Sequence, residues 1–191
     1  MSEPLTERLN AILPLLTSAG LLSGSGIGNE IAFYIFDYPP EEEMRVREHV
    51  RFLVDRLPKV KAGLRVAHVD LLDFVLDYLR RRRLLDKAFQ MQRDKGDEAL
   101  QNALAPALHE SKLTPFFAEV ARPAEHDLIL VSGVGSAYPL LRAHSLLNNL
   151  QTVTGRTPLV LFYPGRYDGQ SLRLFGKLKS NNYYRAFKLV P

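Results

Sequence analysis

The hydrophobic positions along this chain form two patterns, short apolar runs and longer stretches with helical spacing. Short apolar runs that are bounded by turn residues predict buried strands. Such runs occupy residues 31–36, 64–69, 128–131 and 159–162, and a fifth strand is predicted within residues 183–190. Because helical stretches separate most of these runs, the sequence predicts a mainly parallel sheet that is covered on both faces.

Apolar residues three and four positions apart predict the helices. In residues 2–18, for example, Leu5, Leu9 and Ile12 share one face. Further helices are predicted at residues 41–56, 71–85 and 136–151. Residues 86–121 are also expected to be helical, with breaks near Gly96, Pro106 and Pro115.

These elements predict an α/β fold with three layers. We expect a mainly parallel four- to five-stranded sheet, flanking helices and a helical insert at about residues 80–125. The length of 191 residues suits a single domain, residues 1–191, with a sizeable core.

Composition narrows the functional class. No apolar run approaches the roughly eighteen residues of a membrane helix, and Glu3 and Glu7 at the N-terminus do not suit a signal peptide. The chain has no cysteine, which excludes disulfides, thiolate catalysis and cysteine-bound zinc. We therefore expect a cytoplasmic protein without membrane contact.

The charge is distributed unevenly. The net charge is +4, but from Asp127 onward eight Lys or Arg residues face only two acidic residues. Such a basic segment favours an acidic partner, either nucleic acid or protein.

Several polar and glycine residues directly follow predicted strands. Because the carboxyl ends of parallel strands share one edge, where ligands of open α/β folds bind, we expect these residues to lie close together. The candidate sheet-edge site comprises Asp37, Gly133, Gly135, Ser136, Arg142, His144, Tyr163 and Asp168. Arg142 is expected to form an ion pair with Asp37 or Asp168 rather than to act in catalysis.

Gly133 and Gly135 follow a strand and precede a helix, which is where a phosphate can bind to free N–H groups. However, Tyr138 stands where a dinucleotide-binding motif has its third glycine, and no phosphate-loop motif is present. A tight turn with a positive φ angle is therefore the favoured interpretation, and a degenerate nucleotide site is the alternative.

The sequence shows no complete catalytic set. The five histidines lack the spacing of a helical zinc site, and no nucleophile-elbow motif surrounds Ser132 or Ser136. We therefore expect a protein that is not an enzyme and that has no metal and no cofactor.

Aromatic and basic residues are interleaved near the C-terminus. Arg and Tyr dominate the energetically important positions of protein interfaces. We predict one exposed, partner-binding face that comprises Arg166, Tyr167, Arg173, Lys177, Tyr183 and Arg185. The alternatives are that these aromatics stack on nucleic-acid bases or that some of them are buried in the sheet.

Several motifs resemble those of the BrxB family, a small component of bacterial BREX phage-exclusion systems. They are the stretches Tyr163–Gln170, Leu174–Gly176, Asn182–Phe187 and Phe33–Pro40, together with Gly133–Gly135, Pro139–His144 and Leu147–Gln151. The resemblance spans most of the chain and is weakest over residues 80–125.

The resemblance implies a role in phage defence beside an ATPase, a DNA methyltransferase and a PglZ-type phosphatase-like protein, but it implies no reaction. The favoured hypothesis is an assembly component that binds other BREX proteins, with the PglZ-type protein as the expected partner. A direct DNA contact is the alternative. The sequence is compatible with either a monomer or a homodimer.

Overall fold

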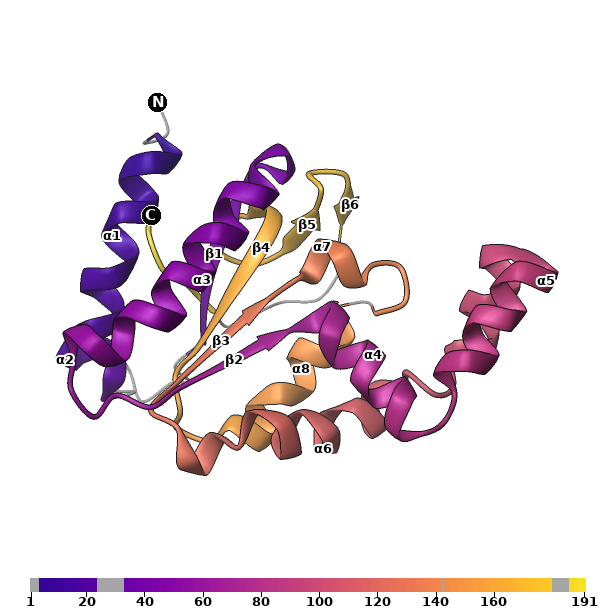
Figure 1. Cartoon of the computed structure of the whole chain (residues 1–191). Helices are drawn as coiled ribbons and strands as arrows, with labels where there is room; N and C mark the ends of the chain where they lie inside the picture. The colour runs from indigo at the N-terminus through magenta and orange to yellow at the C-terminus, as the bar shows by residue number, and fades with distance from the viewer. Residues whose placement is uncertain (1–3, 24–32, 142, 180–185) are drawn as a thin grey trace.

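The computed structural model describes residues 4–23, 33–141, 143–179 and 186–191, and its centre is a parallel sheet (Figure 1). The parallel strands are β1 (Phe33–Tyr38), β2 (Val66–Asp70), β3 (Leu128–Ser132), β4 (Leu159–Tyr167) and β7 (Phe187–Lys188). Their order in the sheet is β2-β3-β4-β1-β7, and each neighbouring pair is parallel. The predicted α/β fold with a mainly parallel sheet is confirmed.

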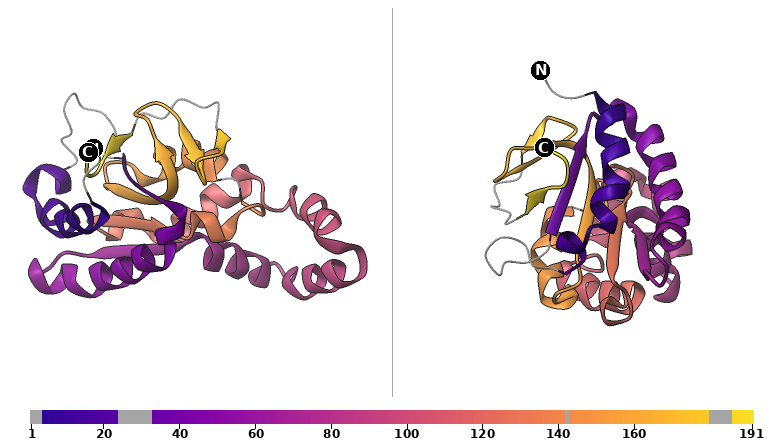
Figure 2. Two further views of the ribbon diagram at one scale, coloured as in Figure 1. Left: turned by 90° about the horizontal axis from the view of Figure 1, so that it is seen from above. Right: turned by 90° about the vertical axis from the view of Figure 1, so that its left-hand side faces the viewer.

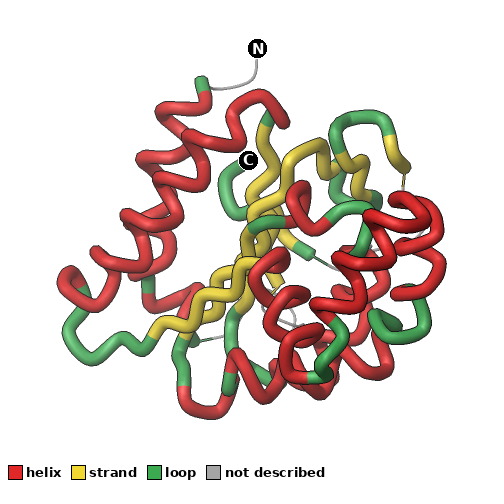
Figure 3. The backbone as a smooth tube through the Cα atoms, turned by 45° about the vertical axis from the view of Figure 1, so that its right-hand side comes forward, coloured by secondary structure: helices red, strands yellow, loops and turns green. Residues whose placement is uncertain are grey.

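Helices cover both faces of this sheet (Figure 2). In Figure 3 the strands form a layer between the helices. One face is covered by α1 (Leu5–Thr17) and α3 (Glu43–Val60), with the short α2 (Ala19–Leu22) after α1. The other face is covered by α4 (Leu71–Arg81), α6 (Glu110–Ala121) and α8 (Ala143–Thr154). Two short 3-10 helices also occur: η1 (Pro40–Glu42) lies between β1 and α3, and η2 (Pro123–Glu125) lies between α6 and β3.

The central strand β3 shows why its apolar run forms this element. Leu128 and Leu130 belong to the core under α1 and α3, whereas Ile129 and Val131 belong to the core under α4, α6 and α8. Alternate side chains of a strand point to opposite faces, so a strand covered on both sides must be apolar at every position.

The predicted helical insert contains two different kinds of helix. α5 (Leu85–Leu104) projects away from the sheet (Figure 1), and Gly96 interrupts it with a φ of 81°. α6 instead packs against the sheet and beside α8. The breaks near Gly96 and Pro106 are confirmed, but the break near Pro115 was wrong, because Pro115 lies inside α6.

The single helix predicted over residues 136–151 was also wrong. The structure has a one-turn helix, α7 (Val134–Ala137), and then an extended residue, Tyr138, before α8 begins. The following Pro139 explains the interruption, because the proline ring disfavours helical backbone at the residue before it.

β4 continues through Pro164-Gly165, although a Pro-Gly sequence predicts a turn. Pro164 pairs with Tyr38 of β1, and Gly165 pairs with Leu174 of β5 (Leu172–Leu174). The pairing of β4 with β3 ends at Leu161, and its pairing with β5 begins at Gly165. Pro164 lies between these two residues, so its lack of an N–H removes no hydrogen bond from either ladder. β5 pairs in turn with the antiparallel β6 (Leu178–Lys179). An Asp-Gly sequence predicts a turn at Asp168-Gly169, and the φ of 93° at Gly169 confirms it.

Candidate functional site at the sheet edge

The carboxyl ends of β1 to β4 share one edge of the sheet, as the sequence predicted. Asp37 pairs with Tyr163 across β1 and β4, and Asp70 pairs with Ser132 across β2 and β3. Because β3 and β4 separate the two carboxylates, the edge holds two distinct polar clusters. Tyr163 itself is buried in the core beneath α6 and α8.

Asp37 is the centre of the first cluster. Its Oδ1 accepts a hydrogen bond of 2.9 Å from the guanidinium of Arg8 in α1, and its Oδ2 accepts one of 3.0 Å from the backbone N–H of Tyr167. The ammonium of Lys188 lies 3.8 Å from Oδ2. Arg142, the expected partner, is outside the described residues, and among the described residues the cations that meet Asp37 are Arg8 and Lys188.

Sequence reasoning missed Arg8. Its side chain is only 13% exposed, and it also donates a hydrogen bond of 2.9 Å to the backbone oxygen of Asp37. The guanidinium lies over the ring of Phe36, 4.8 Å from its centroid. The available signal was helical spacing, because Arg8 follows Leu5 by three residues and precedes Ile12 by four, so it lies on the apolar face.

Asp168 forms hydrogen bonds within its own turn, and Arg142, its other expected partner, lies outside the described residues. Its carboxylate accepts hydrogen bonds from the backbone N–H groups of Gln170 and Ser171 and from the Ser171 hydroxyl. These bonds, led by the one from the Ser171 N–H, lower the pKa of Asp168 to about 2. Asp168 therefore fixes the turn between β4 and β5.

The second cluster surrounds Asp70. Its Oδ1 accepts hydrogen bonds from the N–H groups of Leu72 and Asp73, so Asp70 caps α4. Its Oδ2 accepts a hydrogen bond of 3.3 Å from the Ser132 hydroxyl, and Nε2 of His68 lies 2.8 Å from that hydroxyl. These contacts tie β2, β3 and α4 together.

This second cluster explains Gly133. The φ angle of Gly133 is 75°, which confirms the predicted turn, and a β-carbon there would lie 2.5 Å from Oδ1 of Asp70. A carboxylate therefore occupies the approach to this turn and opposes a bound phosphate. Gly135 is small for a packing reason, because its β-carbon would lie 3.1 Å from Phe175 and 3.2 Å from Pro164. The Ser136 hydroxyl accepts a hydrogen bond of 2.7 Å from Arg47 of α3.

The remaining candidate residues of the edge are only partly described. His144 lies in α8, but its side chain is outside the described part of the structure. Within the described residues, no three His, Asp or Glu side chains are grouped as metal ligands. Asp37 of β1 and His68 of β2 do not share a metal site, because β3 and β4 lie between their strands.

The hairpin formed by the end of β4 with β5 and β6 presents an exposed basic surface. Arg166, Arg173 and Lys177, here called the hairpin cations, are all exposed. The prediction that Tyr167 belongs to this exposed face was wrong, because Tyr167 is 1% exposed and donates a hydrogen bond to the backbone oxygen of Ala186. Tyr183 and Arg185 lie outside the described residues.

A cleft adjoins the hairpin cations at the carboxyl edge. Its volume is about 620 Å³. It is lined by Arg8, Asp37, Tyr38, Pro39, Pro40, Glu41, Gly165, Arg166, Gly176, Lys188 and Pro191. Residues from both ends of the described chain therefore meet at one concave surface.

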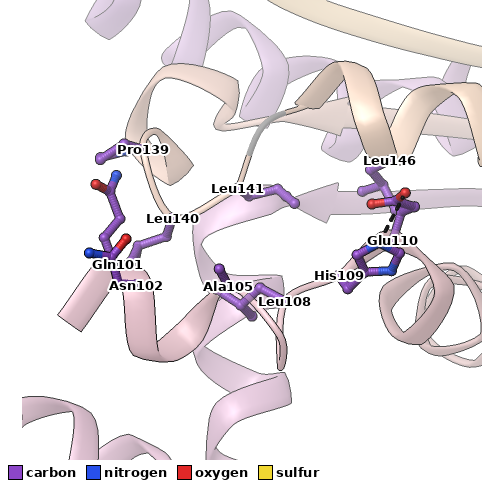
Figure 4. Close-up of a pocket in the computed structure, with 10 residues that line it drawn as sticks. All are labelled: Gln101, Asn102, Ala105, Leu108, His109, Glu110, Pro139, Leu140, Leu141 and Leu146. Carbon is purple, nitrogen blue, oxygen red and sulfur yellow. Dashed lines mark ion pairs between the residues drawn. The ribbon is translucent and has the colours of Figure 1, made fainter. Parts of the chain in front are cut away.

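A second cleft, of about 260 Å³, lies between the end of α5, the start of α6 and the loop before α8 (Figure 4). His109 and Glu110 face each other there, with 3.4 Å between Nε2 and Oε1. Apolar residues such as Leu108 and Leu146 form much of the remaining wall. This cleft contains none of the candidate site residues, although Pro139, Leu140 and Leu141 belong to one of the motifs that resemble the BrxB family.

The sequence of this chain is similar to a known protein family. The family model described as BREX protein BrxB matches residues 67–189. This chain belongs to the BrxB family. A BREX protein BrxB from Bacillus cereus (strain H3081.97) is 40% identical over 190 residues, which cover 97% of each chain. One from Escherichia coli O9:H4 (strain HS) is 39% identical over 192 residues, covering 100% of this chain and 94% of the relative.

No solved structure matches the chain. The family match confirms the resemblance drawn from the sequence motifs, and both the basic hairpin and the β3–α7 turn lie within the matched residues. Among the described helices, none is long and apolar enough to cross a membrane.

Proposed function

We propose that this protein is a non-enzymatic assembly component of a BREX phage-exclusion system that binds other proteins of that system. Membership of the BrxB family makes other BREX proteins its expected partners. We expect the PglZ-type protein to be the one that it contacts, and we expect the assembly to be cytoplasmic.

The observation that carries the proposal is the arrangement of the hairpin cations. Arg166 lies directly opposite Arg173 in the ladder between β4 and β5. Like charges in this position destabilise a hairpin, so the pair is costly to the isolated protein. An acidic partner would remove that cost on binding, and Arg is enriched in protein interfaces.

Nucleic acid is the second candidate partner, because the same cations could contact phosphates. Two features support protein instead. Asp37 and Glu41 line the adjoining cleft, and their carboxylates would repel a continuous phosphate backbone. Leu178, next to Lys177, is an exposed apolar residue, which suits a protein interface better than a phosphate-tracking groove.

A pull-down from cells that express the whole BREX system tests the proposal. The variant with both Arg166→Glu and Arg173→Glu should lose its BREX partners and phage protection while remaining folded. A matched control, with both Arg56→Glu and Arg93→Glu, changes the charge equally at exposed arginines of α3 and α5 that have no ion pair among the described residues. The control should keep its partners.

The opposite result would favour nucleic acid. If the Arg166 and Arg173 variant retains its BREX partners but loses salt-dependent binding to duplex DNA, the protein-docking proposal is wrong and the DNA contact replaces it.

A further inference from the structure

The cleft beside the hairpin contains an uneven set of charges. Arg8, Arg166 and Lys188 contribute three cations, and Asp37 and Glu41 contribute two carboxylates. These charges are not equivalent, because some of them already bind one another and others do not. The available donors decide what the cleft can bind.

Asp37 and Arg8 satisfy each other. Arg8 binds both the carboxylate and the backbone oxygen of Asp37, and the N–H of Tyr167 binds the second carboxylate oxygen. The Asp37 and Arg8 side chains are 9% and 13% exposed, so this pair forms the floor of the cleft. It offers little further hydrogen-bonding capacity to a ligand.

Lys188 and Arg166 differ from this pair. The Lys188 ammonium lies 3.8 Å from Asp37, which is beyond hydrogen-bonding distance, and its side chain is 39% exposed. Arg166 is exposed and has no ion pair or hydrogen bond among the described residues. Both cations line the same cleft, so their donors are available to one anionic group.

The walls between them suit a peptide. Pro39, Pro40, Gly165 and Gly176 provide surface without charged side chains. The side chains of the cleft carry three positive and two negative charges, so one additional negative charge balances them. A row of phosphates would instead bring several negative charges close to the carboxylates of Asp37 and Glu41.

We propose that this cleft binds an Asp or Glu side chain of the partner protein, with the carboxylate held between Arg166 and Lys188. The inference deepens the proposed function and rests on it. Glu41 then opposes binding, so neutralising it strengthens the complex, while neutralising Lys188 or Arg166 weakens it.

A carbodiimide crosslinking experiment on the complex purified from BREX-expressing cells tests this inference. The reagent joins an amine to a carboxylate without a spacer, so mass spectrometry should find Lys188 joined to an Asp or Glu of a BREX protein. Lys188→Arg is the matched control: it keeps the charge and the complex, but the guanidinium cannot form this crosslink.

Binding measurements complete the test. Lys188→Gln and Arg166→Gln should each weaken the complex by about fivefold, and Glu41→Gln should strengthen it by roughly twofold to fivefold, as expected for partly exposed charges. Thermal melting of each variant checks that the fold is intact.

The outcomes separate the two ideas. If the unchanged protein captures no BREX protein, the proposed function fails, and the inference fails with it. If the complex forms but Lys188 joins no partner carboxylate, or if Glu41→Gln weakens binding, only the carboxylate site is wrong. Crosslinks of Lys188 to DNA in place of protein, obtained with formaldehyde, would also overturn the inference.

Discussion

Arg166 of β4 and Arg173 of β5 are direct cross-strand neighbours in an antiparallel ladder. On its other side β5 pairs with β6, where Arg173 is opposite Lys179. On the other side of the same strands, Leu172, Leu174 and Tyr167 are buried, so the alternation of the strands holds the two arginines outward. The hairpin thus exposes a pair of like charges, Arg166 and Arg173, that disfavours the pairing of β4 with β5.

The first prediction follows from that pair. Arg166→Glu places a carboxylate opposite Arg173 and should raise the free energy of unfolding by about 0.2–1 kcal/mol, because an opposite-charge pair replaces a like-charge pair. Urea denaturation at low salt measures this. The variant should be more stable and yet lose its partner, and a loss of stability would contradict the ladder geometry.

The second prediction concerns Gly165. A β-carbon there would clash with the backbone oxygen of Arg173, which cannot rotate away. Gly165→Ala should therefore cost more than about 1 kcal/mol and more than Gly169→Ala, where only the positive φ opposes a side chain. Gly20→Ala, in α2 with nothing within 4 Å of its β-carbon, is the control and should not destabilise. Equal melting of all three variants would disprove the close approach of β4 and β5.

The third prediction concerns the buried pair Arg8 and Asp37. Asp37→Ala leaves the Arg8 guanidinium without its carboxylate in a largely buried position, which should cost about 3–5 kcal/mol. Asp55→Ala, which breaks the exposed pair with Lys59, should cost less than about 1 kcal/mol. A double-mutant cycle with Arg8→Met measures the coupling, and a coupling near zero would show that the pair does not contribute.

The fourth prediction concerns pH. Burial lowers the pKa of His49, and its Nε2 is buried without a hydrogen-bond partner among the described residues. The unfolded chain then binds a proton near pH 6.5 while the folded protein does not, so stability is present above that pH and is lost as the pH falls. Denaturation at pH 7 and pH 5 should show this loss. His49→Phe keeps a ring beside Phe52 and should reduce the loss, and an unchanged pH dependence would exclude His49 as a cause.

The fifth prediction is that the purified protein does not hydrolyse ATP or GTP. The chain lacks the Lys and Ser/Thr of a phosphate loop, and Asp70 places a carboxylate against the only glycine turn at the β3 edge within the described residues. Phosphate release measures this. Turnover that persists through purification and disappears with Arg142→Ala or Asp168→Ala would show that the protein is an enzyme.

The parallel sheet and its polar edge could be predicted from sequence because they follow from local patterns. Buried strands in such a sheet are apolar at every position, and the order of strand and helix places the strand ends together. This pattern and this order were sufficient to predict that Asp37 lies at the edge. Its two partners could not be predicted, because both are far from Asp37 in the sequence: Arg8 comes from α1, and Lys188 comes from β7, which tertiary folding places beside β1.

The hairpin shows where local patterns mislead. Pro164-Gly165 is typical of a turn, but pairing with β1 on one side and β5 on the other keeps the segment extended. The same pairing buries Tyr167 and leaves Arg166 exposed, although a sequence pattern of interleaved aromatics and cations treats them alike. Tertiary contacts, not residue type, decided which of these residues is available to a partner.

The contact of Asp37 with both Arg8 and Lys188 has a consequence for biosynthesis. Lys188 is synthesised long after Arg8 and Asp37, because it follows both of them in the sequence. The cleft therefore lacks one of its cations until β7 has been translated, even when most of the sheet has formed. Under the proposed carboxylate site, a chain that stops before β7 should fail to recognise its partner.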